Sequence, residues 1–344
     1  MLIAAVLLAW IAGTVAAVGW ALSVPGHRGA ASDHFDGRVF ANVGAVHPTR
    51  AWKVLKWIAT RQRGRWRLTT EPAYGPPPPQ EVPGARLRVT LVGHATVLIQ
   101  TGGLSILTDP VWADRCSPVT WAGPRRMRPP GLRFEDLPPI DAVLLSHNHY
   151  DHLDVATLRR LAREHRPRFL VPSGNAAYLA SEGIAGAEDL DWWQSTALGS
   201  LNVTAVPAQH FSGRGLFDRN RTLWCGFVVQ GEGGRVYFAG DTGHGPFLDQ
   251  LAAKFAPLRL ALLPIGAYEP RWFMSPVHMA PDEAVRAHEQ LAARTSVGIH
   301  YGTFQLADDG ELEGAERLRA IVSAAPEPRP RFLLLPFGEG TEVE

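Results

Sequence analysis

The stretch SHNHYDHL, residues 146–153, decides the fold because it places three histidines and an aspartate within six residues, directly after a short apolar run. In an extended chain, residues two apart point to the same side, so His147 and His149 can bind one ion as the chain leaves a strand. Asp151 and His152 come where the chain turns, and they would face a second ion close by. A buried cluster of imidazoles and carboxylate is costly unless a cation pairs with it. The motif therefore predicts a metal centre with two incomplete ligand sets.

Three residues further along the chain share one feature, because each follows the end of an apolar, strand-like segment. They are His210 in VPAQHFSG, Asp241 in FAGDTGH and His300 in GIHYGTF. A rigid strand end holds the loop that follows it, and a carboxylate with two oxygens can bridge two metals. We therefore expect Asp241 to complete both sets, which are His147, His149, His210 and Asp241 for one ion, and Asp151, His152, Asp241 and His300 for the other.

The chemistry of these side chains indicates hydrolysis. Imidazole and carboxylate ligands without thiolate suit two Zn²⁺ ions best, with Fe or Mn as replacements. A pair of metals about 3.5–4 Å apart provides a hydroxide at neutral pH and stabilises the oxygens of a displacement reaction. Asp151 and Asp241 are thus predicted to be catalytic as well as metal-binding, with Asp151 orienting the hydroxide. His94 and Asp109 are predicted to hydrogen-bond the metal ligands rather than bind the ions themselves.

Short strands dominate the first part of the predicted body, and strands alternate with helices after it. Runs rich in Val, Leu, Ile, Phe and Thr, many bounded by Gly, Pro or Asp, predict strands at 88–92, 96–101, 104–108, 141–145, 169–171, 202–206, 224–230, 235–239, 260–265, 297–300 and 331–335. Helices are predicted at 153–165, 174–182, 246–256, 281–293 and 312–323. Two strand-rich halves with interspersed helices predict an α/β fold of the α+β type, in which two sheets pack on each other and helices cover the outside.

The composition excludes some functions. A net charge of +1 over 344 residues argues against a nucleic-acid partner. Cys116 and Cys225 stand far apart and in no CxxC pattern, which argues against a disulfide framework or a thiolate zinc site. A hydrophobic share of 46% is ample for one large core with an appendage.

The first 22 residues carry no charged side chain. A helix of this length, at about 1.5 Å per residue, matches the roughly 30 Å core of a bilayer. No Lys or Arg precedes the run, which favours an uncleaved single-pass anchor over the alternative, a cleaved signal peptide. Seven basic and no acidic residues in 50–67 then predict that the body lies on the cytoplasmic side of the membrane. The expected organisation is a transmembrane anchor at 1–22, a basic, proline-rich juxtamembrane extension at 23–85 and a hydrolase domain at 86–344.

Two surface segments leave alternatives open. Trp52, Trp57 and Trp66 are interleaved with the basic residues of 50–67, which suits either a surface of anionic lipid or a helix that docks on the body through its tryptophans. Four arginines of segment 116–134 either meet lipid head groups or pair with acidic residues such as those at 135 and 136. These arginines are Arg125, Arg126, Arg128 and Arg133.

The motif HxHxDH with a later His, Asp and His resembles the metallo-β-lactamase superfamily. Longer stretches are similar to one branch of it, the N-acyl-phosphatidylethanolamine-hydrolysing phospholipases D. These stretches are VGHATVLI at 92–99, TDPVW at 108–112, GPRRMR at 123–128, PPIDAVLLSHNHYDHLD at 138–154, LDWW at 190–193, FAGDTGH at 238–244, PIGAYEPRWFM at 264–274, HMAPDEAVRAH at 278–288 and HYGTF at 300–304. The resemblance covers the chain from about residue 86 and, more weakly, residues 34–42.

This resemblance implies a four-layer αββα sandwich with two zinc ions at one edge, held by the seven residues already chosen from spacing. It implies cleavage of N-acyl-phosphatidylethanolamine-type phospholipids to phosphatidic acid and N-acylethanolamine, by attack of a metal-bound hydroxide on phosphorus. It also implies that Tyr150 and His278 contact the phospholipid. A homodimer is expected by analogy with family members.

The sequence departs from the animal enzymes of the branch at Val277, Tyr301 and His244, and in its apolar N-terminus. These departures leave the metal ligands intact and concern the choice of substrate. One alternative is therefore a lactonase or thioesterase of the same superfamily. Another is a non-catalytic metal-binding envelope scaffold, against which the presence of all seven ligands argues.

Overall fold

The computed structural model describes residues 2–44 and 51–344 of the chain. Met1 and residues 45–50, which include Arg50 of the predicted basic segment, lie outside the described residues.

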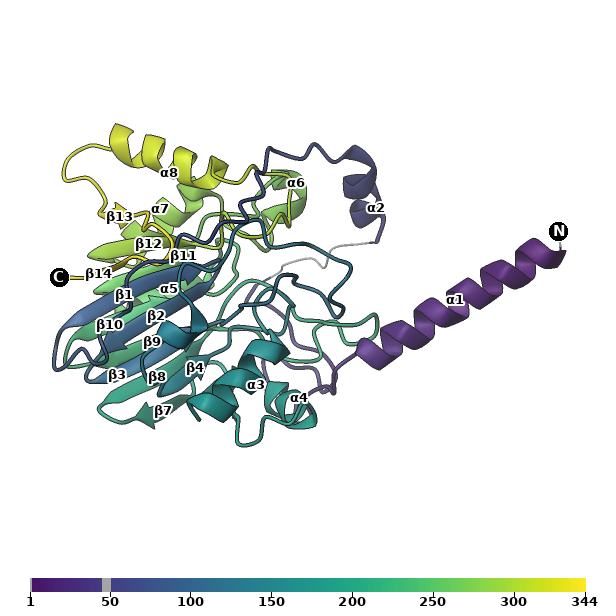
Figure 1. Ribbon diagram of the computed structural model, residues 1–344, viewed down its shortest axis with the longest axis horizontal. Helices are drawn as coiled ribbons and strands as arrows, with labels where there is room; N and C mark the ends of the chain where they lie inside the picture. The colour runs from purple at the N-terminus through teal and green to yellow at the C-terminus, as the bar shows by residue number, and fades with distance from the viewer. Residues whose placement is uncertain (1, 45–50) are drawn as a thin grey trace.

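Two mixed sheets, stacked on each other in Figure 1, form the centre of the described structure. The first sheet has the strand order β14 (Gly340–Glu342), β1 (Leu87–Gly93), β2 (Thr96–Thr101), β3 (Leu104–Thr108), β4 (Ala142–Leu144), β5 (Arg168–Pro172) and β6 (Glu188–Leu190). The second has the order β13 (Phe332–Leu333), β12 (Thr295–Ile299), β11 (Leu260–Pro264), β10 (Gly234–Phe238), β9 (Gly226–Gly231), β8 (Leu201–Val206) and β7 (Ser195–Leu198). Neighbours from β3 to β6 and from β10 to β13 are parallel, and the others are antiparallel.

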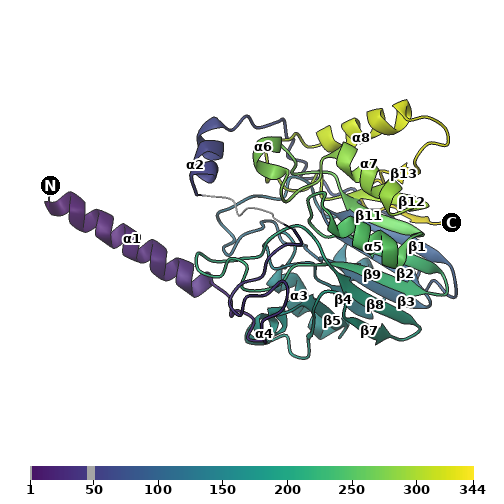
Figure 2. The ribbon, with the colours of Figure 1, turned by 180° about the vertical axis from the view of Figure 1, so that it is seen from behind.

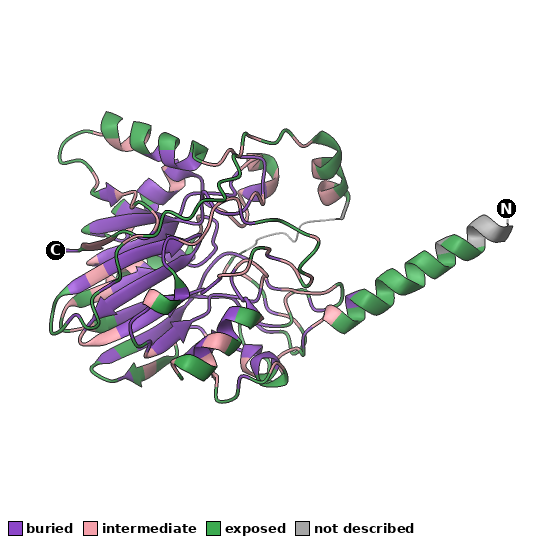
Figure 3. Ribbon diagram, viewed as in Figure 1, coloured by how far each residue is buried: buried purple, intermediate pink, exposed green. Residues whose placement is uncertain are grey.

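Alternation of side chains along the strands explains why the sheets stack, since successive residues point to opposite faces. In β2, Val97 and Ile99 belong to the large core cluster that both sheets share. Leu98, between them, belongs instead to a second cluster with Leu158 and Leu179 of the covering helices. The first sheet is thus apolar on both faces and is buried between the second sheet and a helix layer (Figure 3).

Helices cover the two outer faces, as Figures 1 and 2 show from opposite sides. Helices α3 (Val155–Glu164) and α4 (Asn175–Ser181) pack on the first sheet. Helices α5 (Phe247–Phe255), α7 (Pro281–Gln290) and α8 (Glu313–Ala324) pack on the second. The short helices η1 (Phe134–Asp136) and α6 (Arg271–Met274) lie in loops. Asp154 caps α3 by accepting a hydrogen bond from the Ala156 N–H at 3.1 Å, and so ends the loop that carries the histidine motif.

The N-terminal helix α1 (Leu2–Leu22) extends away from the body (Figure 1). Its last turn meets the loop at 211–221, where the Leu216 N–H donates to the Gly19 carbonyl at 3.2 Å and the Phe217 N–H donates to Ser23 Oγ at 3.1 Å. Within the part of the chain that the structure describes, no helix combines the length and the apolar character that crossing a membrane requires.

Helix α2 (Ala51–Thr60) and the basic segment after it dock on the body. Trp57 stacks on Phe273 with ring centroids 4.9 Å apart, and Trp66 Nε1 donates to the Asp309 carbonyl at 2.9 Å. Arg61 forms an ion pair with Asp308 at 2.8 Å. Two of the three tryptophans of this region therefore contact the protein. Trp52 differs, because 55% of it is exposed.

The predicted α/β class, with two mixed sheets and helices, is confirmed. Each expected strand and helix has an observed counterpart that overlaps it, such as 96–101, which is β2. The prediction missed β6, β7, β14, α6 and the short helix η1.

Candidate metal centre

Six strands that run in the same direction deliver polar side chains to one edge of the stacked sheets. In the first sheet, His94, Asp109 and the 146–153 motif follow the carboxyl ends of β1, β3 and β4. In the second sheet, the carboxyl ends of β8, β10 and β12 are followed by His210, Asp241 and His300. Residues scattered over the chain therefore meet where the two sheets adjoin, as the strand-end argument predicted.

Three histidines form the first ligand group. His147 Nε2 lies 2.8 Å and His210 Nε2 lies 3.3 Å from His149 Nδ1, and these three residues can offer one atom each to a single ion. Asp241 Oδ2 lies 3.8 Å from His210 Nε2. This group agrees with the first predicted set.

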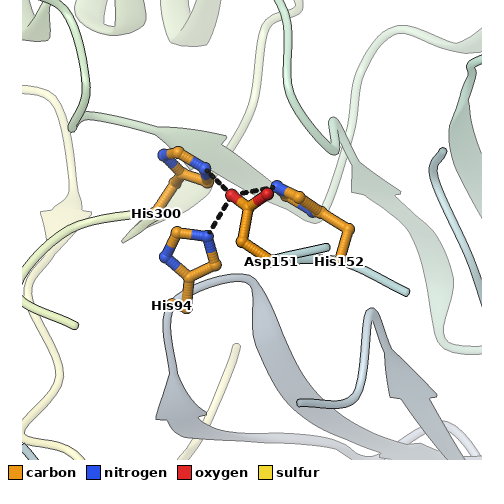
Figure 4. Close-up of side chains that lie close together, drawn as sticks. All are labelled: His94, Asp151, His152 and His300. Atoms are coloured by element: carbon orange, nitrogen blue, oxygen red, sulfur yellow. Dashed lines mark hydrogen bonds and ion pairs between the residues drawn. The ribbon is translucent and has the colours of Figure 1, made fainter. Parts of the chain in front are cut away.

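Asp151 lies at the centre of the second group, and Figure 4 shows its carboxylate pointing toward three imidazoles. Asp151 Oδ2 is 2.9 Å from His94 Nε2, 3.2 Å from His152 Nε2 and 3.4 Å from His300 Nε2. Asp241 reaches this group as well, with Oδ2 3.2 Å from His152 Nε2 and Oδ1 3.1 Å from His300 Nε2. One carboxylate thus faces both groups, which is the arrangement that a bridging ligand needs.

Buried polar groups behind the ligands hold them in place. Asp109 accepts from His152 Nδ1 at 2.6 Å and from the Ser146 N–H at 2.7 Å, and His210 Nδ1 donates to the Val277 carbonyl at 3.0 Å. The contacts of Asp109 with His152, and of His94 with Asp151, place both residues where the predicted supporting role requires them. That role stays a prediction.

Strained backbone accompanies this site. His94, Asp109 and His300 have φ values of 54°, 34° and 62°, in the left-handed region that residues with a side chain rarely adopt. Such conformations persist only where the surroundings fix them, and they gather at functional sites.

Burial and the neighbouring charges shift the pKa values of the first group and of Asp241. Burial lowers the pKa of His149 to about 4 and holds the pKa values of His147 and His210 well below their usual value. Burial opposes ionisation of Asp241, but His152 and His300 outweigh it and keep the Asp241 pKa well below its usual range. The first group therefore presents neutral imidazoles beside an anion, the state in which these side chains bind metal ions.

The second group attracts positive charge. Burial lowers the pKa of His300, but Asp241 and Asp151 overcome this effect and raise it to about 9. The pKa of His152 lies well above its usual value because the same two carboxylates and Asp109 outweigh its burial. The field that favours protons on these rings also favours a divalent cation among them.

Unpaired atoms show that the residues fit metal ions. Among the described residues, the buried atoms without a hydrogen-bond partner include His152 Nε2, Asp241 Oδ1 and His300 Nε2. A buried polar atom without a partner costs roughly 1–3 kcal/mol, and a cation held by the second group together with Asp241 would satisfy all three. The donor set contains no thiolate, which agrees with zinc or another divalent ion of similar preference.

A cavity of about 260 Å³ opens over the ligands. It is lined by Cys116, Pro124, His149, Tyr150, Asp151, His210, Phe211, Asp241, His278 and Leu306. Both predicted substrate contacts are in this lining. His278 Nδ1 lies 3.9 Å from Asp241 Oδ2 and has no hydrogen-bond partner among the residues that the structure describes. The Tyr150 hydroxyl donates to the Arg214 carbonyl at 3.2 Å, and the Arg214 guanidinium lies 3.8 Å from the centre of the Tyr150 ring.

The structure brings all the predicted site residues to this edge, together with some that the sequence did not indicate. Phe211 and Cys116 line the cavity, and Asn42 contacts the backbone of His210. Only the position of Phe211 next to a predicted ligand could have suggested it.

Three of the four arginines of segment 116–134 are engaged within the protein. Arg126 is buried and donates to the carbonyls of Val111 and Ala113. Arg128 pairs with Glu311, and Arg133 pairs with Asp136 at 2.8 Å. For these three residues the structure favours the intramolecular alternative.

Comparison with known proteins agrees with the geometry. A family model described as "Beta-lactamase superfamily domain" matches residues 105–301. An uncharacterised protein of Mycobacterium tuberculosis is 46% identical over 248 residues, which are 71% of this chain and 65% of that protein, so the chain spans less than two thirds of that relative. The N-acyl-phosphatidylethanolamine-hydrolyzing phospholipase D 1 of Caenorhabditis elegans is 41% identical over 270 residues, which are 74% of this chain and 75% of that enzyme.

A solved structure shows the same fold. The metallo hydrolase Igni18 of the archaeon Ignicoccus hospitalis aligns with a TM-score of 0.56 at 22% identity, over 75% of this chain and 99% of that one.

Proposed function

Because the chain belongs to the beta-lactamase superfamily of metal-dependent hydrolases, we propose that it is a two-zinc phosphodiesterase. Its proposed substrates are N-acyl-phosphatidylethanolamine-type phospholipids, which it cleaves to phosphatidic acid and N-acylethanolamine. The observation that carries this proposal is the meeting of two ligand groups around Asp241, in a chain 41% identical to a phospholipase D of this specificity.

The proposed centre uses seven side chains. His147, His149 and His210 would hold one ion, Asp151, His152 and His300 the other, and Asp241 both. When bound, two zinc ions supply positive charge for the phosphate oxygens and a water that ionises near neutral pH.

Asp151, besides its proposed place among the seven side chains, and His278 direct the reaction. Asp151, held by His94 at 2.9 Å, orients the attacking water. The water oxygen adds to phosphorus and gives up a proton, the bond from phosphorus to the ethanolamine oxygen breaks, and the leaving oxygen takes up that proton. His278, whose Nδ1 has no partner within residues 2–44 and 51–344, hydrogen-bonds a phosphate oxygen or the leaving oxygen. The cavity is smaller than the roughly 300–1,000 Å³ that encloses a drug-sized ligand, which suits a head group whose acyl chains stay outside.

We propose, from its sequence, that the N-terminal segment 1–22 anchors the protein in a membrane, with the body on the cytoplasmic side. The support is the uncharged sequence of residues 1–22 and the seven basic residues of 50–67. The loop at 211–221, which meets the end of α1, follows directly on the proposed ligand His210. An anchor at this point would keep the metal centre beside its lipid substrate.

The substrate is tested with full-length, zinc-loaded protein in detergent. Three compounds are offered separately: N-acyl-phosphatidylethanolamine, phosphatidylcholine and an acyl-homoserine lactone. We expect phosphatidic acid from the first and none from a His210→Ala variant. Opening of the lactone without phosphatidic acid would instead support a lactonase, and inertness of a protein that retains two zinc ions would support a scaffold.

The side of the membrane on which the body lies is tested by adding protease to sealed cells from which the outer layers have been removed. The body should be protected until the membrane is opened. Digestion of the body in sealed membranes would contradict the cytoplasmic placement.

A further inference from the structure

The proposed ligand His210 lies in a long loop. No helix or strand is assigned between Val206, the end of β8, and Gly226, the start of β9, a stretch that the structure describes throughout. Asp241 is three residues from the end of its strand and His300 follows its strand directly. His210 is four residues past the end of its strand, so the sheet alone does not fix its backbone, and other parts of the chain must hold it.

Asn42 makes that contact from 168 positions away in the sequence. Its Nδ2 donates to the His210 carbonyl at 2.9 Å, and its Oδ1 accepts from the His210 N–H at 3.0 Å. Trp224 Nε1 donates to the same Oδ1 at 2.9 Å. Two N–H donors face Oδ1 and a carbonyl faces Nδ2, so these partners determine which end of the Asn42 amide is oxygen and which is nitrogen. One side chain thus holds both backbone polar groups of His210.

Asn42 is itself held by the segment that carries it. Phe35 and Phe40 are each 2% exposed and belong to the main core cluster. The Phe40 N–H donates to the Asn220 carbonyl at 2.7 Å, and the His27 N–H donates to the Arg221 carbonyl at 2.7 Å. Residues 23–44 therefore form a strap that is bonded along the same loop that contains His210.

We propose that Asn42 is a positioning residue of the metal centre, which holds His210 where it can share an ion with His147 and His149. The proposal rests on the two-metal centre proposed above. The His210 ring is fixed separately, because Nδ1 donates to the Val277 carbonyl and Nε2 points to the His149 ring, 3.3 Å from its Nδ1. Asn42 sets the position of the backbone from which this ring extends.

The test compares full-length wild type with an Asn42→Ala variant. Zinc content is measured by elemental mass spectrometry during titration with a chelator. Loss of a group that orients a ligand typically weakens metal binding about 10–100-fold. We expect that loss for one of the two ions and unchanged affinity for the other. A His210→Ala variant should lose the same ion, which identifies it.

A matched control is Asn202→Ala, since Asn202 is an exposed asparagine on β8, the strand that leads into this loop. It should keep both ions at wild-type affinity. If Asn42→Ala does not fold, Asn42→Asp is used, because it keeps the acceptor for His210 N–H and Trp224 and replaces the Nδ2 donor by a carboxylate oxygen, which repels the His210 carbonyl. This variant should weaken the same single ion.

Two results would overturn the positioning role. One is wild-type affinity for both ions in the Asn42 variants. The other is equal weakening of both ions together with a lower unfolding temperature, which general destabilisation would produce. Wild-type protein that binds no zinc would refute the proposed function itself, and this outcome is distinct from both.

Discussion

At the scale of single residues, Asp241 has the central place because its two carboxylate oxygens face different histidines. Oδ2 is 3.2 Å from His152 Nε2 and 3.8 Å from His210 Nε2, and Oδ1 is 3.1 Å from His300 Nε2. A change at this position should therefore affect both halves of the proposed centre.

An Asp241→Asn variant replaces one oxygen of the bridge by an amide and removes its negative charge. We expect metal content to fall from two ions to one or none. Turnover should fall about a thousand-fold or more, since metals contribute several kcal/mol to such reactions and about 1.4 kcal/mol corresponds to tenfold. Elemental analysis and phosphatidic acid release measure the two effects.

Asp309→Asn is the control for this change, because Asp309 is another buried carboxylate and belongs to none of the metal-binding groups among the described residues. It should keep both ions. Two bound ions and full activity in Asp241→Asn would show that the bridging assignment is wrong.

Asp309 itself provides a pH-dependent prediction. Burial raises its pKa to about 6, although it accepts hydrogen bonds from the backbone of Ala267 and Glu269. Below about pH 4 the carboxyl is protonated in both the folded and the unfolded chain, and its contribution to the free energy of unfolding is fully present. As the pH rises toward 6, the unfolded chain loses this proton while the folded chain still holds it, so the contribution is lost by the time the pH passes 6. The loss over this range is on the order of 3 kcal/mol, since a tenfold change in proton affinity corresponds to about 1.4 kcal/mol.

The measurement compares the free energy of unfolding of wild type and Asp309→Asn at pH 4 and pH 7. The variant has no proton to lose at this position, so the wild type should weaken relative to it over that range. A difference that is the same at both pH values would contradict the raised pKa.

The sequence indicated the seven proposed ligands because each leaves a local signal, either the HxHxDH spacing or a polar residue after an apolar strand. Asn42 leaves no such signal. Its contact with His210 joins positions 168 apart, and only the folded chain brings them together. The left-handed backbone of His94, Asp109 and His300 is likewise invisible in the sequence, since it is imposed by the neighbouring structure.

At the scale of whole elements, the strands that were missed are all edge strands. β14 and β6 bound the first sheet and β7 bounds the second. Edge strands need fewer apolar residues, and the sequence EDL of β6 contains one. Their pairing with a neighbour makes them strands, so alternation within the segment does not predict them.

Helix α2 combines a docked face with an exposed apolar face. Trp57 stacks on Phe273, whereas Trp52, Leu55 and Ile58 are 55%, 67% and 59% exposed. Lys56 on the same helix lies over the Trp272 ring at 4.7 Å, and α2 has no acidic residue. An exposed apolar face with basic neighbours is typical of contact with an anionic lipid surface.

A variant that combines Trp52→Gln, Leu55→Gln and Ile58→Gln tests this face. We expect KM for substrate in anionic vesicles to rise several-fold to about tenfold, because apolar side chains gain free energy when they leave water. KM for a short-chain substrate dissolved in water should not change. Kinetics on the two forms of substrate separate these effects.

Leu312→Gln serves as the control, since Leu312 is 41% exposed and lies outside α2. It should leave both KM values unchanged. Equal rises of both KM values in the triple variant would indicate damage to the site rather than to a lipid contact.

At the scale of the molecule, the proposed centre lies where the two sheets adjoin. The first sheet supplies the 146–153 motif, and the second supplies His210, Asp241 and His300. Ions held by both groups would join the sheets as well as serve the reaction. Such binding adds to the free energy of folding, because the unfolded chain has no assembled site.

Removal of metal should therefore lower the unfolding temperature. Binding at a thousand times the dissociation constant contributes about 4 kcal/mol, and a shift on the order of 10 °C follows for a protein of roughly this size. Thermal unfolding is followed before chelation, after it, and after zinc is restored. Asn202→Ala changes an exposed residue outside the proposed ligands and should show the wild-type shift. An unfolding temperature indifferent to zinc would contradict the joining role.

The position of the ligands on both sheets also has a consequence inside the cell. A chain that has lost its ions would open more often along the junction, and an opened chain is a substrate for proteases. Zinc starvation should then reduce the abundance of the protein as well as the turnover rate of each enzyme molecule. The steady-state amount of the protein would then depend on the zinc supply of the cell, independently of its catalytic activity.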